Sequence, residues 1–300
     1  MTVAIEVEGL RKSYGELVAV DGVSFHVDEG EFFGILGPNG AGKTTTLEMV
    51  EGLRQPDGGS VRIFGESPWP RNLKILRRIG VQLQASAFFD RLTALEQLQT
   101  FGALYGVPNS VAQEMLELVG LEEKASTREN NLSGGQRQRL SIACALVHDP
   151  DIVFLDEPTA GLDPQARRNL WDLLDAIKDR GKTIVYTTHY LEEAEELCDR
   201  VAIMESGKIL AIDTPSNLVG VLDAPTRILI KHGVLSPELA GGLAGVDSVT
   251  PDGGSLVLST RAPATVLGAL EDHQALDKVQ VRTATLEDVF LSLTGRKYRE

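Results

Sequence analysis

Residues 37–45 read GPNGAGKTT, and this is the most informative stretch of the chain. It matches the spacing G-x-x-x-x-G-K-[ST], in which glycines let backbone N–H groups wrap around phosphates. The apolar stretch FFGIL at 32–36 precedes it and the helical pattern TTLEMVEGL follows it. This strand, loop and helix order is what phosphate binding requires, and a glycine-rich turn without a ligand does not account for it. We therefore predict a phosphate-binding loop.

Two residues of this loop carry most of its expected chemistry. The ammonium group of Lys43 is placed to reach the β- and γ-phosphates of a nucleotide, and the hydroxyl group of Thr44 is placed to bind Mg²⁺. The loop as a whole supplies the predicted nucleotide-binding residues, which are Gly37, Pro38, Asn39, Gly40, Ala41, Gly42, Lys43, Thr44 and Thr45.

Two carboxylates follow another apolar strand pattern, in IVFLDEPTAGLD at 152–163. Asp156 is expected at the carboxyl edge of a parallel sheet, where ligands collect and a carboxylate can hold Mg²⁺. Adjacent side chains of a strand point in opposite directions, so Glu157 can address a water molecule beyond the γ-phosphate as a general base. Taken alone the pair would cap the next element, but beside a phosphate-binding loop it predicts a metal and catalytic site.

Three further residues are weaker candidates on sequence grounds. His189 follows the apolar pattern TIVYT and belongs to the same sheet edge, although a single histidine there is more often structural. Tyr14 follows a short strand pattern, and its ring suits either the core or a stack on adenine. Gln84 follows RRIGVQL, and an isolated glutamine is usually a surface amide.

The stretch LSGGQRQRL at 132–140 raises the question of why one chain should hold two anion-binding devices. Ser133, Gly134 and Gly135 precede a helical pattern, and the N–H groups of a helix start attract anions. One helix start contributes only roughly 0.3–1 kcal/mol, whereas millimolar binding requires about 4 kcal/mol. This stretch therefore does not hold a nucleotide alone. The competing interpretation is an ordinary helix with Ser133 as its N-cap, and the spacing to IVFLDE and the second glycine argue against it.

The spacing of apolar residues predicts an α/β fold, and the phosphate-binding loop makes a P-loop NTPase (RecA-like) core the expected one. Continuous apolar runs are typical of strands buried on both faces of a parallel sheet, and they occur at 32–36, 152–155, 183–187 and 201–204. Alternating segments predict a small antiparallel sheet beside it, namely IEVEGL, VSFHV and SVRIFG. Between about 86 and 145, apolar residues at three- and four-residue spacing predict an inserted α-helical subdomain.

A different pattern begins near residue 225. The order of expected elements is β-α-β-β-α-β, the split βαβ arrangement of a small ferredoxin-like α+β domain, and the amphipathic stretch TLEDVFLSL follows it. Pro215, Gly220 and Pro225 interrupt the pattern between the two parts. We therefore expect a nucleotide-binding domain at 1–220 and an accessory or regulatory domain at 221–300.

Composition narrows the functional classes. The 300-residue chain has a formal net charge of −14, which argues against non-specific nucleic-acid binding because that usually requires a basic surface. Cys144 and Cys198 lie in helical patterns and fit a reducing compartment. The N-terminal stretch lacks the apolar run of a signal peptide. No stretch approaches the roughly 18–20 apolar residues that span a bilayer, so a membrane role is expected to come through a partner.

The chain resembles the ATP-binding-cassette (ABC) family, in its nucleotide-binding subunits, over roughly residues 3–215. The resemblance rests on motifs in family order, which are GPNGAGKTT, Gln84, LSGGQ at 132–136, IVFLDE at 152–157, GLD at 161–163 and His189. It implies that Tyr14 stacks on adenine, that Gln84 joins the Mg²⁺ site to a membrane partner, and that Asp163 crosses to the partner's site. It also implies that His189 contacts the γ-phosphate and holds Glu157 and the attacking water. The expected catalytic residues are then Lys43, Glu157 and His189.

The same resemblance explains the two anion-binding stretches. In this family two cassettes dock head to tail, and LSGGQ of one closes over ATP held by the phosphate-binding loop of the other. The residues that are predicted to contact the partner's ATP across this dimer are Ser133, Gly134, Gly135 and Gln136. ATP and Mg²⁺ are the implied cofactors. One loop and one LSGGQ in the chain imply a second cassette, for which a second copy in a two-fold dimer is the simplest partner.

The resemblance also implies a transporter motor. The stretch TLEDVFLSLTGR resembles subunits of the drug- and polysaccharide-export (ABC-2) type, which act with a separate transmembrane permease. We therefore expect an ATP-hydrolysing subunit held at the cytoplasmic face of the cell membrane through that permease. The alternative is a soluble cassette ATPase that acts on ribosomes or DNA, although such proteins usually carry two cassettes or long coiled-coil insertions. An unrelated GTPase or kinase would not account for LSGGQ.

Overall fold

The computed structural model describes residues 2–83, 88–231, 233–276, 279–295 and 298. This part of the chain forms two compact units, of which the first runs to Pro215 and the second spans Ser216–Tyr298. Each unit has its own cluster of buried apolar side chains. All of the nucleotide-binding motifs considered above fall in the sequence of the first unit.

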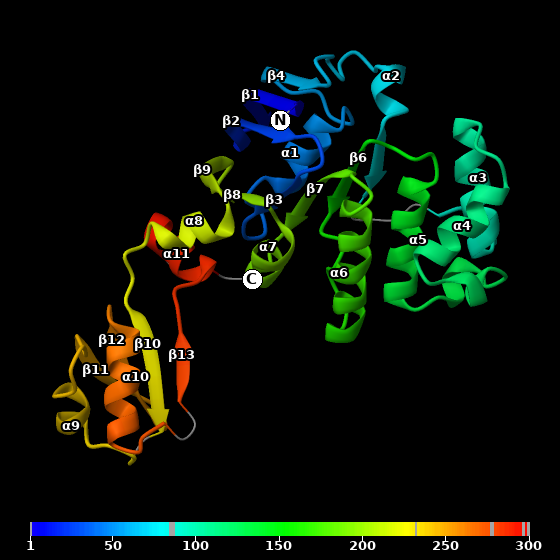
Figure 1. The fold of residues 1–300 in the computed structure, drawn as a ribbon. Coiled ribbons are helices and arrows are strands. Elements are labelled where there is room, and N and C mark those ends of the chain that lie inside the picture. Colours follow the sequence, from blue (N-terminus) through cyan, green and yellow to red (C-terminus); the bar gives the residue numbers. More distant parts are fainter. Residues whose placement is uncertain (1, 84–87, 232, 277–278, 296–297, 299–300) are drawn as a thin grey trace. The chain divides into compact units, whose positions relative to one another are not determined.

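A six-stranded sheet forms the centre of the first unit (Figure 1). Its strands stand in the order β5, β6, β7, β3, β8, β9, and all neighbours pair in parallel except β8 and β9. The strands are β3 (Phe32–Leu36), β5 (Ile79–Gln82), β6 (Ile152–Asp156), β7 (Thr183–Thr188), β8 (Arg200–Glu205) and β9 (Lys208–Asp213). Every residue of β3, β6 and β7 is buried, as expected for strands covered on both faces. Because these three strands are parallel, the polar residues at their carboxyl ends meet at one edge.

A three-stranded antiparallel sheet accompanies the large one. Its order is β2, β1, β4, with β1 (Val3–Tyr14), β2 (Leu17–Asp28) and β4 (Gly58–Ile63). Helix α1 (Lys43–Val50) contacts strands of both sheets, and its side chains Leu47, Met49 and Val50 belong to one core cluster with theirs. The phosphate-binding loop is therefore anchored at its helical end by apolar packing between two sheets.

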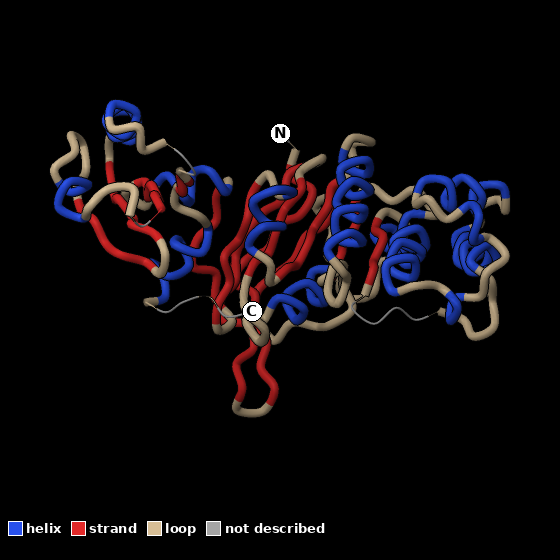
Figure 2. The backbone as a smooth tube through the Cα atoms, turned by 90° about the horizontal axis from the view of Figure 1, so that it is seen from below, coloured by secondary structure: helices blue, strands red, loops and turns tan. Residues whose placement is uncertain are grey.

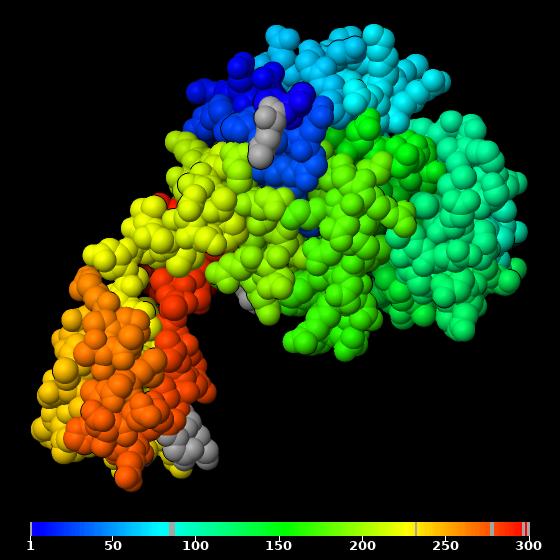
Figure 3. Space-filling view, in the orientation of Figure 1, coloured from blue at the N-terminus to red at the C-terminus, as the bar shows by residue number. Residues whose placement is uncertain are grey.

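The described chain between β5 and β6, from residue 88 onward, contains the predicted helices. It contains α3 (Ala94–Tyr105), α4 (Ser110–Leu118), the 3₁₀ turns η1 (Glu122–Lys124) and η2 (Glu129–Asn131), and α5 (Gly134–Leu146). The short α2 (Leu73–Leu76) comes before β5. Helices α3 and α5 begin with capping boxes at Thr93 and Ser133, which satisfy N–H groups at the helix starts. In Figure 3 these inserted helices cover a different side of the first unit from the N-terminal strands.

Two further helices follow strands of the large sheet and set the places of candidate site residues. Helix α6 (Pro164–Lys178) follows β6, and α7 (Leu191–Leu197) follows β7. The tube view shows helices flanking the strands of this unit (Figure 2). Asp163 is consequently at the start of α6, and His189 lies between β7 and α7.

The second unit contains the predicted β-α-β-β-α-β order. Its sheet order is β11, β12, β10, β13 with antiparallel pairs throughout, built from β10 (Thr226–Lys231), β11 (Ser248–Asp252), β12 (Ser255–Thr260) and β13 (Gln280–Arg282). Its helices are α8 (Pro215–Gly220), α9 (Pro237–Gly241), α10 (Pro263–Asp272) and α11 (Leu286–Thr294). Ile228, Ile230, Leu258 and Leu270 lie in its core. The predicted fold class, an α/β P-loop NTPase core with a small α+β domain, is confirmed.

Candidate active site

The phosphate-binding loop joins β3 to α1 and requires glycine at two tight places. A Cβ atom at Gly37 would lie 2.2 Å from the carbonyl oxygen of Met204. Gly42 has φ +104°, and a Cβ atom there would lie 2.4 Å from the carbonyl oxygen of Ala19. The N–H group of Gly37 also donates to the carbonyl oxygen of Thr188 over 3.3 Å. The loop is thus fixed in place where it leads into a helix start, whose N–H groups favour an anion.

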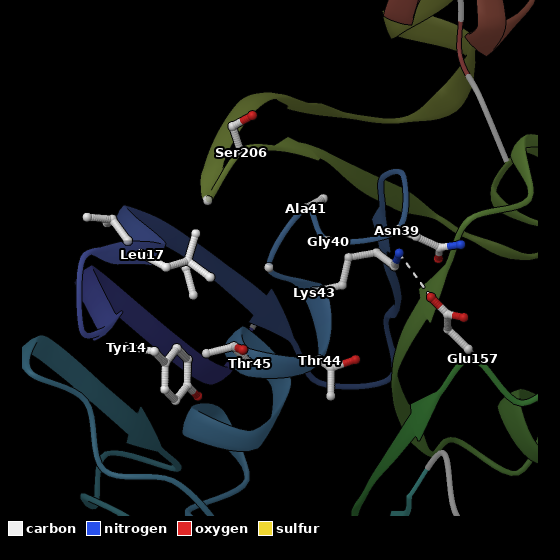
Figure 4. Close-up of a pocket in the computed structure, with 14 residues that line it drawn as sticks. Tyr14, Leu17, Asn39, Gly40, Ala41, Lys43, Thr44, Thr45, Glu157 and Ser206 are labelled. Carbon is white, nitrogen blue, oxygen red and sulfur yellow. Dashed lines mark ion pairs between the residues drawn. The ribbon is translucent and has the colours of Figure 1, made fainter.

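Lys43 lies at the floor of this loop, with 4% of its side chain exposed. Its Nζ donates to the carbonyl oxygens of Gly37 at 2.8 Å and Pro38 at 3.2 Å. It also forms an ion pair with Oε1 of Glu157 at 3.0 Å, and Figure 4 shows the two side chains pointing toward each other. An ammonium group has three N–H donors. A phosphate that binds Lys43 must therefore compete with these three acceptors. Two of them are neutral carbonyl oxygens, and the third is the charged carboxylate of Glu157.

Glu157 is held between two side chains. Its Oε2 lies 3.0 Å from Nδ1 of His189, and both side chains are largely buried. The structure corrects the predicted reason why the Glu157 side chain points away from that of Asp156. Strand β6 ends at Asp156, and Glu157 has φ 44° in the left-handed region. The argument from strand alternation was wrong, because a left-handed backbone turns this side chain, and the N–H group of Glu157 donates to Oγ1 of Thr187 over 3.0 Å. Such strain costs roughly 1–3 kcal/mol and clusters at functional sites.

Thr44 and Asp156 present oxygen atoms suited to a hard cation. Oγ1 of Thr44 lies 3.2 Å from Oδ1 of Asp156, which also accepts a hydrogen bond from Oγ1 of Thr187 at 2.6 Å. Burial raises the pKa of Asp156, while the hydrogen bonds from Thr187 and Thr44 act in the opposite direction. A cation would favour the ionised carboxylate. Mg²⁺ usually takes one or two protein ligands and completes its shell with phosphates and water, so these residues fit it.

A cavity of about 530 Å³ opens over the loop. Tyr14 stands at its wall with 41% exposure, and the guanidinium carbon of Arg54 lies 5.3 Å from the centre of its ring. Figure 4 shows Tyr14 and Leu17 on the side of the antiparallel strands and Lys43 and Glu157 across the cavity. The lining includes most of the predicted nucleotide site, namely Tyr14, Asn39, Gly40, Ala41, Gly42, Lys43, Thr44, Thr45 and Glu157.

Sequence reasoning missed the rest of this lining, which is Leu17, Val18, Ala19, Ser206 and Gly207. Leu17, Val18 and Ala19 begin strand β2, and Ser206 and Gly207 form the β8–β9 turn. The N–H group of Gly207 donates to the carbonyl oxygen of Ala41 over 2.9 Å, which holds that turn against the loop. Thr187 was also missed, although a polar residue at the end of an apolar strand is a usable signal. The start of β2 and the β8–β9 turn carry no such signal, because their proximity to the loop depends on how two sheets pack.

The LSGGQ stretch forms the start of α5. Oγ of Ser133 accepts from the N–H of Gln136 at 3.3 Å, and Oε1 of Gln136 accepts from the N–H of Ser133 at 2.9 Å. Of the four unpaired N–H groups of a helix start, those of Gly134 and Gly135 then remain. Among the residues that the structure describes, the lining of the 530 Å³ cavity includes none of 133–136. Ser133 is therefore the N-cap that the sequence spacing argued against, and that argument was wrong because a cap leaves the N–H groups of Gly134 and Gly135 to an anion. The described residues of one chain do not bring its two anion-binding stretches into one cavity.

Two other predicted residues lie away from the cavity lining or outside the described chain. Asp163 is the exposed N-cap of α6, and its Oδ1 accepts from the N–H groups of Gln165 at 3.0 Å and Ala166 at 2.9 Å. Gln84 lies outside the described residues. Of the helices that are described, none combines the length and the apolar character needed to cross a membrane.

This fold and these motifs define a P-loop nucleotide-hydrolysing cassette. The family model for "ABC transporter" matches residues 20–160. The chain is 43% identical over 302 residues to the Nod factor export ATP-binding protein I of Paraburkholderia xenovorans (strain LB400), with 99% of each chain covered. It is 37% identical to the linearmycin resistance ATP-binding protein LnrL of Bacillus subtilis (strain 168), with 99% of this chain and 100% of that one covered.

A solved structure extends this likeness to the fold. The dimeric structure of a bacterial ABC transporter cassette matches with a TM-score of 0.65 and 31% identity, over 70% of this chain and 98% of that chain. The chain therefore belongs to the ABC transporter family, as an ATP-binding and ATP-hydrolysing subunit. The family and the ATPase activity implied by the sequence resemblance are confirmed.

Proposed function

We propose that this chain is the motor subunit of an ABC exporter, in which ATP binding joins two cassettes and hydrolysis separates them. The observation that carries the proposal is the setting of Glu157, whose carboxyl oxygens lie 3.0 Å from Nζ of Lys43 and 3.0 Å from Nδ1 of His189. A buried base is thereby placed beside the lysine of the phosphate-binding loop and is oriented by a histidine.

In the proposed reaction Glu157 accepts a proton from water as the water oxygen bonds to the γ-phosphorus. The bond between that phosphorus and the bridging oxygen to the β-phosphate breaks, and ADP and phosphate are released. Lys43 stabilises charge on the transferred group, and His189 holds Glu157 through the Nδ1–Oε2 contact. Mg²⁺, bound by Thr44, Asp156 and Gln84, would neutralise phosphate charge.

We propose that the starts of α5 and α6 contact the ATP that the partner cassette holds. Ser133 and Gly134 are exposed, and so is Asp163. They are therefore open to a second cassette, and the contributing residues would be Ser133, Gly134, Gly135, Gln136 and Asp163. With two identical copies, a two-fold axis gives two equivalent composite sites. The dimeric state of a related cassette supports this assignment.

A second, mainly apolar cavity of about 270 Å³ supports a membrane partner. It lies against β5 and the helical subdomain, and its lining includes Val81, Phe101 and Tyr105. Leu83 and Phe88, the described residues on either side of the segment that contains Gln84, also line it. We assign this groove to a short helix of the permease that presents apolar side chains. The groove would carry movement at the nucleotide site to the membrane subunit.

Export is the proposed direction because relatives that match along their whole length are named for export and for resistance. In this proposal the chain is held on the cytoplasmic face of the cell membrane through its permease. No nucleic-acid partner is expected, given the net charge of −14. We further propose that residues 221–300 pair subunits or regulate the motor. Removing 225–300 should then change dimerisation, ATPase rate or transport, and no change in any of them would exclude both roles.

The test is to purify tagged Glu157→Gln chain from native membranes with ATP and Mg²⁺ and to identify its partners. Glu192→Gln, a change of an exposed glutamate to the same amide, is the matched control. A polytopic membrane protein retained by Glu157→Gln supports the motor. Recovery of ribosomes or DNA-bound factors without a membrane protein would instead favour the alternative, a cassette ATPase with no permease.

A further inference from the structure

A buried polar cluster lies beside the candidate active site and is not used by the reaction described above. Its centre is Glu193 in α7, whose side chain is 0% exposed. Oε2 of Glu193 accepts hydrogen bonds from Oη of Tyr186 at 2.7 Å and from Oγ1 of Thr188. Burial of a carboxyl group is costly unless its oxygens have hydrogen-bond partners. One oxygen of Glu193 is well satisfied.

The other oxygen is not. Within the described chain neither Oε1 of Glu193 nor Nε of Arg167 has a hydrogen-bond partner, although the two atoms lie 3.8 Å apart. That distance allows an ion pair but exceeds the roughly 2.7–2.9 Å of a charge-assisted hydrogen bond. A shift of about 1 Å would satisfy both buried atoms at once. The contact is therefore longer than a hydrogen bond in this structure, and it would strengthen if the two atoms moved together.

Arg167 connects this open contact to both α6 and His189. It lies one turn after Asp163, and its N–H group donates to the carbonyl oxygen of Asp163 over 2.9 Å. Its guanidinium carbon lies 4.1 Å from the centre of the Tyr190 ring, which in turn lies 4.2 Å from the ring of His189. Packing therefore connects the start of α6 to the side chain that holds the proposed base.

Glu193 is also connected to the residues around His189 by a second route, through Thr188. Its partner Thr188 uses Oγ1 to accept from the N–H of Tyr190 at 2.9 Å. The carbonyl oxygen of Thr188 accepts from the N–H of Gly37 in the phosphate-binding loop. The cluster therefore fixes the backbone on both sides of His189. Among the described residues, the oxygen of Glu193 that lacks a hydrogen bond is the one that faces Arg167 of α6.

We propose that Arg167 and Glu193 are positioning residues that couple the place of Asp163 to the place of His189. This inference rests on the proposed function, in which Asp163 meets the partner cassette and His189 holds Glu157. When pairing of two cassettes shifts the start of α6, Arg167 moves with it and closes on Oε1 of Glu193. Once this contact is closed, the Tyr190 and His189 side chains lie in the positions that hydrolysis requires. Two sites are coupled when a contact differs in strength between two states.

The experiment compares Arg167→Met, Glu193→Gln and the double variant with Arg168→Met, a control that removes a charge from the exposed neighbouring residue. We measure kcat, KM for ATP and thermal stability. We expect kcat to fall roughly ten- to a hundredfold in each single variant while KM changes by less than about twofold. The double variant should be no slower than the slower single variant, because both changes open the same contact. Arg168→Met should keep the wild-type kcat.

Several outcomes overturn the inference. Arg167→Met hydrolysing ATP as fast as Arg168→Met would exclude the coupling. Losses that multiply in the double variant would show two independent effects, and a loss of kcat that only follows a loss of folded protein would show a structural role. If Glu193→Gln does not fold, Arg167→Met still tests the coupling, because the methionine keeps an apolar side chain packed on Tyr190. Wild-type activity in Glu157→Gln would instead refute the proposed base, which is a separate failure.

Discussion

Nζ of Lys43 and Oε1 of Glu157 form an ion pair at 3.0 Å, with only 4% and 9% of the two side chains exposed. The phosphate-binding lysine and the proposed base are therefore each other's partner in this conformation. A γ-phosphate bound by Lys43 competes with Glu157 for the same ammonium group. Nucleotide binding should consequently release the carboxylate toward water, so that the base becomes available when its substrate is present.

This pairing predicts two opposite effects of Glu157→Gln. Loss of the base should lower the ATPase rate by roughly 10²–10⁴-fold. ATP should bind more tightly, by about 1 kcal/mol or roughly fivefold, because a neutral amide competes less well for Lys43. Calorimetric titration with Mg²⁺ and ATP measures the affinity, with Glu192→Gln as the control. An unchanged affinity would show that the ion pair does not oppose nucleotide binding.

Tyr14 should contribute affinity through its ring face. The ring is 41% exposed at the cavity wall, and Arg54 lies 5.3 Å from its centre, so the residue offers a supported flat surface. Stacking of a base on an aromatic ring is worth roughly 1–3 kcal/mol, and Tyr14→Ala should therefore raise the Kd for ATP roughly 5- to 150-fold. Tyr14→Phe should keep the wild-type Kd.

The same stacking predicts little selectivity among bases, since every base has a π face. Tyr14→Ala should weaken ATP and GTP by similar factors in equilibrium titrations. A loss confined to ATP would show that Tyr14 reads an edge of adenine, and an unchanged Kd for both nucleotides would place the base elsewhere.

The parts of the site that could be predicted from sequence are those in which local chain order decides the outcome. FFGIL followed by GPNGAGKTT fixes a strand, a loop and a helix in immediate succession, and β3 and α1 have that order. Asp156 could be placed because it ends a strand that is buried throughout. The start of α5 could be placed because Ser133, Gly134 and Gly135 precede a helical pattern, although the N-cap role of Ser133 was not predicted.

The remaining parts depend on contacts between distant segments. The direction of the Glu157 side chain depends on a φ of 44°, which cannot be predicted from the residue type. It also depends on a hydrogen bond to Thr187 on a neighbouring strand. The 3.8 Å contact of Arg167 with Glu193 joins two helices that follow different strands. Such pairings follow from sheet order, and apolar periodicity identifies strands without ordering them.

Glu51 predicts a pH dependence of folding stability. It caps the end of α1 at 1% exposure, and in the described chain neither carboxyl oxygen has a hydrogen-bond partner. Burial, with smaller contributions from the charges of Asp156 and Glu48, raises the pKa of Glu51 from its ordinary 4.5 to about 8. The folded state therefore binds a proton that the unfolded state releases between these pH values.

The free energy of unfolding should consequently fall as pH rises from about 4.5 to about 8, by up to about 1.4 kcal/mol per pH unit from this group. Glu51→Gln keeps the shape without the titration, so it should flatten this slope and be more stable than wild type near pH 8. Urea unfolding across this range measures both effects, with the exposed Glu16→Gln as the control. An equal slope in wild type and Glu51→Gln would show that Glu51 is not the titrating group.

Gly134 allows folding and the composite ATP site to be tested separately. A Cβ atom at Gly134 meets nothing within 4 Å in this chain, whereas one at Gly135 would lie 3.0 Å from Cβ of Ala166. Gly134→Ala should therefore leave stability unchanged or raise it by up to about 1 kcal/mol through helix propensity. The added methyl group would stand where the partner's phosphate approaches the helix start, so the ATPase rate and ATP-driven dimerisation should fall at least roughly tenfold.

Gly268→Ala, also in a helix with nothing within 4 Å, is the matched control and should change only stability. Wild-type ATPase activity in Gly134→Ala would mean that LSGGQ does not close over a partner's nucleotide.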